Sequence, residues 1–160
     1  MKRVIDRPNM FFVVIMLVAA TMAAIAIRIV PEAKLELYDY VSGELITSFP
    51  MSGGGEFAIS FMHSVNGAPF TDYYRIEDSD IILTGSRFYN LGGGLEPAVR
   101  PSDKLSYDEG SFRLEGTERV QNSLCYAASA SFDLVLIIGS EKQSLGLLCG
   151  KNRIIEFRAN

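Results

Sequence analysis

The sequence is poor in the residues that build catalytic and metal centres. It contains one histidine and two cysteines. Two cysteines are too few for a zinc site, which needs four ligands at close spacing. No Gly-x-Ser-x-Gly segment is present, so the nucleophile elbow of the α/β-hydrolases is absent. These absences weigh against metal-dependent and serine-hydrolase chemistry.

Basic residues are scarce after the amino terminus. The first 28 residues hold four of the 15 basic residues and one of the 19 acidic residues, so residues 29–160 carry a formal charge of −7. Nucleic acids and anionic lipid headgroups are bound by basic surfaces. The sequence therefore predicts no nucleic-acid partner. It shows no internal repeat, and about 130 residues suit a single domain.

Only one long apolar run is present, Met10–Ile27, which contains no charged residue. Three basic residues precede it and Arg28 follows directly. A helix of this length is about 27 Å long, close to the hydrocarbon thickness of a bilayer, and the preceding basic residues favour a cytoplasmic amino end. The prediction is that residues 1–28 form a cytoplasmic terminus and a single transmembrane or signal-anchor helix of the inner membrane. Residues 29–160 are then an exported, periplasmic domain.

Two other interpretations of this run stay open. Ala24-Ile25-Ala26 has the small-x-small form of a signal-peptide cleavage site. The run would then be the hydrophobic part of a signal peptide that is removed. A buried helix of a soluble domain is the second alternative, but the run has no amphipathic stripe.

The sequence of residues 29–160 predicts strands separated by turns. Short runs rich in β-branched and aromatic residues recur every eight to twelve residues, which is typical of an antiparallel β-sandwich or a partly open barrel. The fold class predicted is therefore all-β. The expected strands are Leu35–Tyr40, Leu45–Phe49, Glu56–Met62, Tyr73–Glu77, Ile81–Thr84, Lys104–Tyr107, Ser111–Glu115, Leu124–Ala128, Phe132–Ile138, Gly146–Cys149 and Arg153–Phe157.

The only histidine ends an apolar row. Period-two alternation gathers four side chains on one face of a strand: Phe57, Ile59, Phe61 and His63. Asn66-Gly67 follows and is a strong hairpin signal, which would return Thr71–Ile76 beside the first strand. Asp72 and Tyr74 would then approach His63 across the ladder. His63 with these neighbouring polar side chains would bind a polar ligand. Alternatively, His63 would be hydrogen-bonded within the domain and have a structural role.

Cys125 and Cys149 are the only two cysteines. An oxidising compartment would allow them to form a disulfide, which would stabilise the domain by roughly 3 to 4 kcal/mol. The alternative is that both are small buried side chains whose thiols never meet. The sequence favours neither.

Two motifs resemble the DUF1850 family. The first is Phe61–Val65 followed by Pro69 and by Asp72–Arg75, and the second is Arg87-Phe88 followed by Gly92–Leu95. This family consists of small exported or membrane-anchored bacterial proteins without an established activity. Many are encoded beside the fused membrane component of TRAP-type solute transporters of the TAXI class.

The resemblance extends over residues 35–157 and implies an accessory protein of such a transporter. The chain would act by docking to the membrane component, not by catalysis, and without a metal or other cofactor. The binding or docking candidates are His63, Ser64, Asp72, Tyr74, Arg75, Arg87, Gly92 and Gly94.

The chain also departs from the family pattern. Asp72 stands where a glutamate is usual, Gly85 where the family is often acidic, and Ser144 where a polar or histidine residue is expected. These departures weaken the case that this chain shares a catalytic or metal-binding set of residues with the family. A domain that binds or senses a small solute is the main alternative. A hydrolase using Ser64 and His63 is less favoured, because adjacent strand residues point to opposite faces.

Overall fold

The computed structural model describes residues 14–18, 33–51, 54–63, 67–89, 99–129, 133–150 and 152–160. The chain divides into two units, residues 1–32 and 33–160. In the first unit, residues 14–18 are helical. Within the described ranges, no helix combines the length and the apolar character that crossing a bilayer requires. Most of the predicted membrane helix lies outside these ranges.

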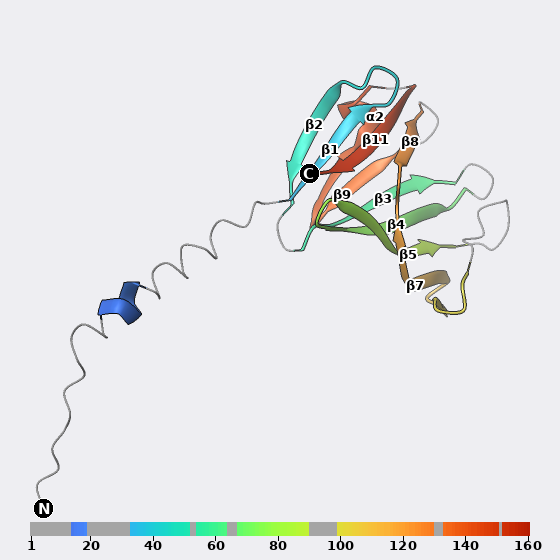
Figure 1. Cartoon of the computed structure of the whole chain (residues 1–160). Coiled ribbons are helices and arrows are strands. Elements are labelled where there is room, and N and C mark those ends of the chain that lie inside the picture. Colours follow the sequence, from blue (N-terminus) through green and yellow to red (C-terminus); the bar gives the residue numbers. More distant parts are fainter. Residues whose placement is uncertain are drawn as a thin grey trace, which may run out of the picture. The chain divides into compact units, whose positions relative to one another are not determined.

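The second unit is built from two antiparallel sheets, as the all-β prediction required (Figure 1). One sheet has the strand order β2-β1-β11-β8, and the other has the order β10-β9-β3-β4-β5-β7-β6. The strands are β1 (Lys34–Asp39), β2 (Leu45–Pro50), β3 (Glu56–Met62), β4 (Pro69–Glu77), β5 (Asp80–Phe88), β6 (Lys104–Asp108), β7 (Ser111–Val120), β8 (Leu124–Ala128), β9 (Val135–Ile138), β10 (Glu141–Ser144) and β11 (Arg153–Ala159).

The main core lies between the inner faces of the two sheets. Alternate residues of each strand point inward, because successive strand side chains point to opposite faces. The four-stranded sheet contributes Leu35, Leu37, Leu124, Ile155 and Phe157, and the seven-stranded sheet contributes Phe57, Ile59, Tyr74, Ile76 and Leu136. Phe57 and Ile59 of the predicted apolar row are buried, but Ala58 between them is buried too, and Phe61 is half-buried.

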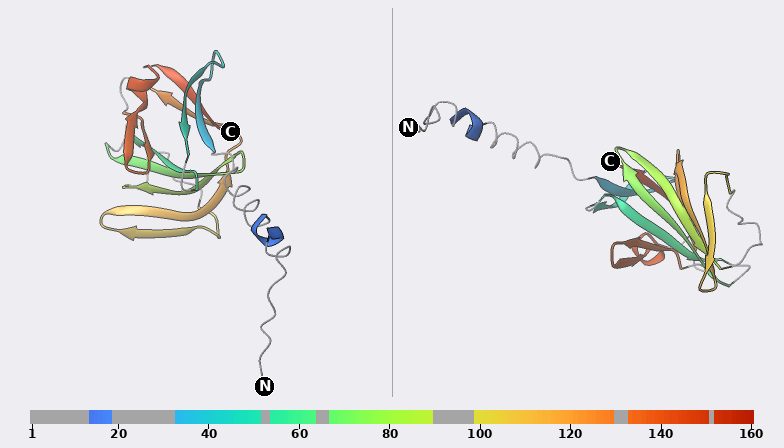
Figure 2. Two further views of the ribbon diagram at one scale, coloured as in Figure 1. Left: turned by 90° about the vertical axis from the view of Figure 1, so that its left-hand side faces the viewer. Right: turned by 90° about the horizontal axis from the view of Figure 1, so that it is seen from below.

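A second apolar cluster lies on the strands of the larger sheet. Aromatic rings from neighbouring strands stack in a continuous row, with centroids 4.8 to 5.7 Å apart. The rings, from β3 to β6, are those of Phe61, Phe70, Phe88, Phe112 and Tyr107. In Figure 2, the β6 and β7 end of this sheet lies away from β1 and β2. The row therefore connects β3 and β4, which contribute to the main core, with β5, β7 and β6.

One predicted element differs from the one observed, and one observed strand was not predicted. Gly146–Cys149 was expected to be a strand, but Leu145–Leu148 forms the single-turn helix α2. Its first side chain, Leu145, is fully buried and anchors the turn, while Leu147 is 84% exposed. One buried side chain is enough to anchor a single helical turn, whereas a strand on the core would place every second side chain inward. The strand β10 was not predicted, because all four of its residues are polar.

The first and last strands meet in the middle of the smaller sheet. β1 pairs with β11 along its whole length. Lys34 and Asn160 exchange two backbone hydrogen bonds, of 2.7 and 3.0 Å. The two ends of the domain are therefore adjacent, and the β1–β2 turn lies at the opposite end of β1.

Candidate functional site

The predicted hairpin between β3 and β4 is present. The His63 N–H donates to the Ala68 carbonyl at 2.9 Å, close to the turn. Along the ladder, Asp72 lies opposite Ile59. This is four residues from His63, or about 13 Å along the strand. The structure therefore does not bring Asp72 and Tyr74 to His63.

The structure describes only some of the remaining predicted candidates. The His63 Nδ1 atom is buried and has no hydrogen-bond partner in the described part of the chain. Ser64, Gly92 and Gly94 lie outside the described residues. The positions that the structure does place belong to β4 and β5, and they divide between the two faces of the larger sheet.

A hydrogen-bonded cluster around Asp72 joins the two sheets. The Ser86 hydroxyl on β5 donates to Asp72 Oδ1 at 2.5 Å, and the Tyr126 hydroxyl on β8 donates to Oδ2 at 2.9 Å. The Tyr74 hydroxyl lies 2.8 Å from that of Tyr126 and 3.5 Å from Asp72 Oδ2. Because β8 belongs to the smaller sheet and β4 and β5 to the larger one, this carboxylate links the layers.

The carboxylate of Asp72 has only neutral partners. It forms no ion pair within the part of the chain that the structure describes. Loss of hydration raises the pKa of Asp72, and the hydroxyl hydrogen bonds oppose this rise only in part. Burial and the nearby carboxylate also raise the pKa values of Tyr74 and Tyr126. Both phenols thus stay protonated and act as hydrogen-bond donors.

This cluster is better suited to holding the sheets together than to contacting a solute. Ser86 is only 2% exposed and Tyr74 only 4% exposed. The Ser86 hydroxyl donates to a carboxylate and not to a histidine, so the cluster does not contain the serine–histidine pair of a hydrolase. Sequence reasoning selected Asp72 and Tyr74 but missed Ser86 and Tyr126. The strand Leu124–Ala128 was predicted, yet its place opposite β4 was not.

The two candidate arginines lie on the outer face of the larger sheet. Arg75 donates to Glu77 at 2.9 Å and to Glu118 at 2.9 Å. The Arg87 Nε atom donates to the Ser111 hydroxyl at 3.0 Å. Arg75 is thus neutralised within the domain, on the face opposite to that of Asp72.

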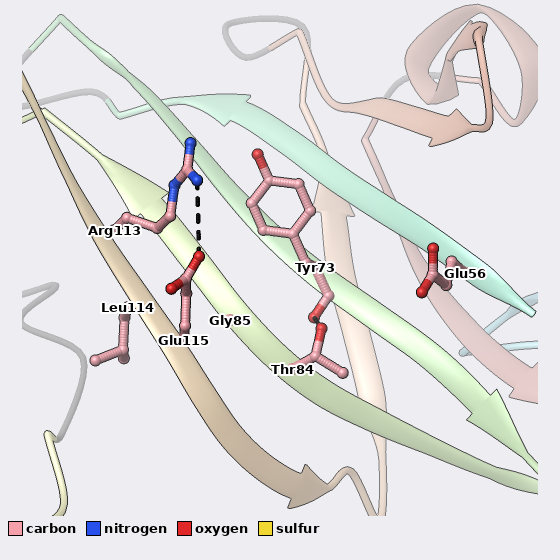
Figure 3. A pocket seen from close by; sticks show the side chains of 7 residues that line it. All are labelled: Glu56, Tyr73, Thr84, Gly85, Arg113, Leu114 and Glu115. Atoms are coloured by element: carbon pink, nitrogen blue, oxygen red, sulfur yellow. Dashed lines mark hydrogen bonds and ion pairs between the residues drawn. The ribbon is translucent and has the colours of Figure 1, made fainter. Parts of the chain in front are cut away.

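The same outer face is hollowed over β4, β5 and β7 (Figure 3). The hollow has a volume of about 430 Å³ and is open to solvent. Its lining is Glu56, Tyr73, Thr84, Gly85, Arg113, Leu114 and Glu115. A volume of this size lies within the range of small-molecule and side-chain pockets. None of these residues was among the predicted site residues.

Irregular pairing between β5 and β7 produces the hollow. Leu83 pairs with Arg119 and Gly85 with Glu115, so three residues of β7 face one residue of β5. A Cβ atom on Gly85 would lie 2.4 Å from the Leu114 carbonyl oxygen. Only glycine allows the backbones to approach this closely. Bulges of this kind often lie beside binding sites because they redirect side chains.

The cysteines do not form the disulfide that the sequence allowed. Both thiols are free, with Cys125 exposed on β8 and Cys149 buried after α2. Cys149 is part of the main core, and burial raises the pKa of its thiol. No group of three or more histidine, cysteine, aspartate or glutamate side chains in the described ranges is arranged to hold a metal ion.

Comparison with protein-family models identifies a family for this chain. Residues 57–145 match the family described as a domain of unknown function, DUF1850. The chain belongs to the DUF1850 family. No curated protein and no solved structure matches it. The resemblance of the two sequence motifs to this family is thereby confirmed.

The DUF1850 match covers one layer of the sandwich and its link to the other. It contains β4–β10, nearly all of β3, and the whole Asp72 cluster, Tyr126 included. The strands β1, β2 and β11 lie outside it. The DUF1850 region of this protein is therefore the larger sheet with β8, and both the cluster and the floor of the hollow belong to it.

Proposed function

We propose that this protein is a membrane-anchored, extracytoplasmic accessory protein of a TRAP-type solute transporter of the TAXI class. It acts by docking to the membrane component of the transporter and not by catalysis. The resemblance to DUF1850 proteins, many of which are encoded beside that component, supports the transporter association.

Anchoring is supported by the sequence of the first 28 residues. The uncharged run Met10–Ile27 is flanked by basic residues, and its length as a helix suits a bilayer. One such helix confines the domain to the membrane surface. Its effective concentration near a membrane partner is then far above its concentration in free solution.

The observation that carries the docking proposal is the hollow over Gly85. Tyr73, which is 40% exposed, and Arg113 stand on its walls. Tyrosine and arginine are among the residue types that are enriched at the centres of protein interfaces. The polar groups inside the sandwich, by contrast, are bonded to one another around Asp72.

Site-specific photocrosslinking tests the docking proposal. A benzophenone amino acid at position 73 is expected to crosslink to the transporter's membrane component in cells that produce both proteins. The matched control is position 48, because Ser48 is exposed on the outer face of the smaller sheet. Equal crosslinking from both positions, or none from position 73, would contradict docking through the hollow.

The two thiols provide a test of the membrane topology. In intact spheroplasts, a membrane-impermeant maleimide is expected to label Cys125, which is exposed. Cys149 should react only after denaturation, since it is 5% exposed. Mass spectrometry of the labelled peptides reports both sites. If Cys125 is labelled only after the membrane is disrupted, the domain is not extracytoplasmic.

Capture of a small polar solute is the second candidate function. The volume of the hollow, about 430 Å³, and its mixed polar lining favour this alternative. It predicts that a transported solute binds the protein in the absence of the membrane component, with saturable changes in the backbone amide shifts of Tyr73 and Thr84 in an NMR titration. Docking alone predicts no such changes.

A further inference from the structure

Among the residues that the structure describes, one charged side chain in the hollow over Gly85 has no counterion. The charged side chains that line it are Glu56, Arg113 and Glu115. Arg113 and Glu115 pair with each other, with 3.6 Å between Nη1 and Oε1. Among the described residues, Glu56 forms no ion pair. The lining therefore carries an excess negative charge.

The cation nearest to Glu56 across the ladder is already neutralised. Arg75 lies directly opposite Glu56 in the β3–β4 pairing. Its guanidinium, however, is bound by Glu77 at 2.9 Å and by Glu118 at 2.7 Å. Arg87 and Lys104 lie opposite Arg113 and Glu115 on the neighbouring strands but do not line the hollow. The lining itself therefore has two carboxylates and one guanidinium, and this excess of one negative charge favours a cationic partner group.

Tyr73 supplies an aromatic surface beside this charge. In Figure 3, its ring stands between the Arg113–Glu115 pair and Glu56. An aromatic face attracts a cation that lies over it, and a guanidinium does so more often than an ammonium group. A guanidinium is also planar and hydrogen-bonds a carboxylate with two parallel N–H groups. The ring of Tyr73 and the carboxylate of Glu56 together are therefore suited to bind a guanidinium group.

We infer that the hollow accepts an arginine side chain of the transporter's membrane component. This inference rests on the proposed docking function and names the chemistry of the contact. The guanidinium lies over Tyr73 and is bound by Glu56. Glu115 adds to the negative field, because its own contact with Arg113 is long and solvent-exposed. The net charge of −7 for residues 29–160 attracts the same partner surface from a distance.

Binding of a free probe tests this chemistry without the transporter. The full-length protein in detergent micelles is titrated with N-acetyl-arginine amide, and backbone amide shifts are followed by NMR. Saturable shifts are expected at Tyr73, Thr84 and Gly85, with a dissociation constant in the millimolar range. Glu56→Gln should weaken binding by about two- to fivefold, the range for an exposed ion pair. The anionic probe N-acetyl-glutamate amide should produce no saturable shift at these positions.

Glu44→Gln is the matched control. Glu44 is exposed in the turn between β1 and β2, so the same loss of one charge there should leave the affinity unchanged. Equal affinity of the wild type and Glu56→Gln for the arginine probe, or the absence of saturable shifts, would overturn the inference. Unaltered amide shifts elsewhere in Glu56→Gln show that the variant is folded.

Failure of the inference is distinguishable from failure of the proposed function. Crosslinking from position 73 to the membrane component that persists unchanged in Glu56→Lys would refute the arginine contact and leave docking intact. Absence of that crosslink in the wild-type background refutes docking through this face. The probe titration decides the chemistry of the hollow in either case.

Discussion

Replacing Asp72 with asparagine is expected to abolish a fall in stability that the wild-type protein shows as the pH rises. Burial raises the folded-state pKa of Asp72 above its unfolded value. The folded protein then binds more protons than the unfolded chain between these two values. The free energy of unfolding therefore decreases as the pH rises through this window, which begins at about pH 4. Below that pH, protonated Asp72 makes its full contribution to the stability of the folded protein.

Unfolding of the full-length protein in detergent at a series of pH values measures this effect. The sequence has no tryptophan, so near-ultraviolet circular dichroism of the tyrosines is the signal. Asp72→Asn should be at least as stable as the wild type at pH 8. Asp80→Asn is the control, because Asp80 is exposed, and it should keep the wild-type pH dependence. A wild-type protein that gains stability over the same window would contradict the proposed environment of Asp72.

Loss of a donor should have the opposite effect to loss of the charge. Tyr126→Phe removes the hydroxyl that bridges Asp72 and Tyr74. The buried carboxylate then keeps its charge but loses one of its hydrogen bonds. We expect the free energy of unfolding to fall by about 1 to 3 kcal/mol. Wild-type stability of this variant would mean that the cluster does not link the sheets.

Gly85→Ala is expected to cost about 1 to 3 kcal/mol of stability, the usual range for overpacking. The added methyl group would lie 2.4 Å from the backbone oxygen of Leu114. A flexible side chain could move aside, but this oxygen belongs to the neighbouring strand. The β5–β7 pairing must therefore widen. Thermal unfolding in detergent measures the loss.

Gly146→Ala is the matched control for this substitution. Gly146 lies in α2, and a Cβ atom there would meet nothing within 4 Å. Alanine also favours the helix by roughly 0.5 to 1 kcal/mol over glycine. This variant should be as stable as the wild type or slightly more so. Equal effects of the two substitutions would show that Gly85 is not uniquely confined.

Local patterns in the sequence were sufficient to predict the strands and the hairpin. The alternation from Phe57 to Phe61 predicts the buried face of β3, and the Asn-Gly pair predicts the return of β4. Both signals depend on residues that are close in the sequence. The short α2 turn was missed because Leu145 alone anchors it, and a single side chain produces no periodicity.

Contacts between distant strands could not be predicted in this way. Tyr126 is 54 residues from Asp72, and they meet only because β8 joins the smaller sheet opposite β4. The hollow depends on unequal numbers of residues in β5 and β7 between two paired positions. No local pattern specifies either arrangement. The predicted approach of Asp72 to His63 failed for a related reason, since the hairpin register separates them.

The pairing of β1 with β11 imposes an order on folding. β11 lies between β1 and β8, and it is synthesised after the other strands of both sheets. Until then, the β1–β2 hairpin and β8 have no common neighbour, and isolated hairpins are only marginally stable. The inner surface of the larger sheet stays uncovered over the same interval. A chain that stalls before residue 153 would therefore present an incomplete sandwich to chaperones and proteases.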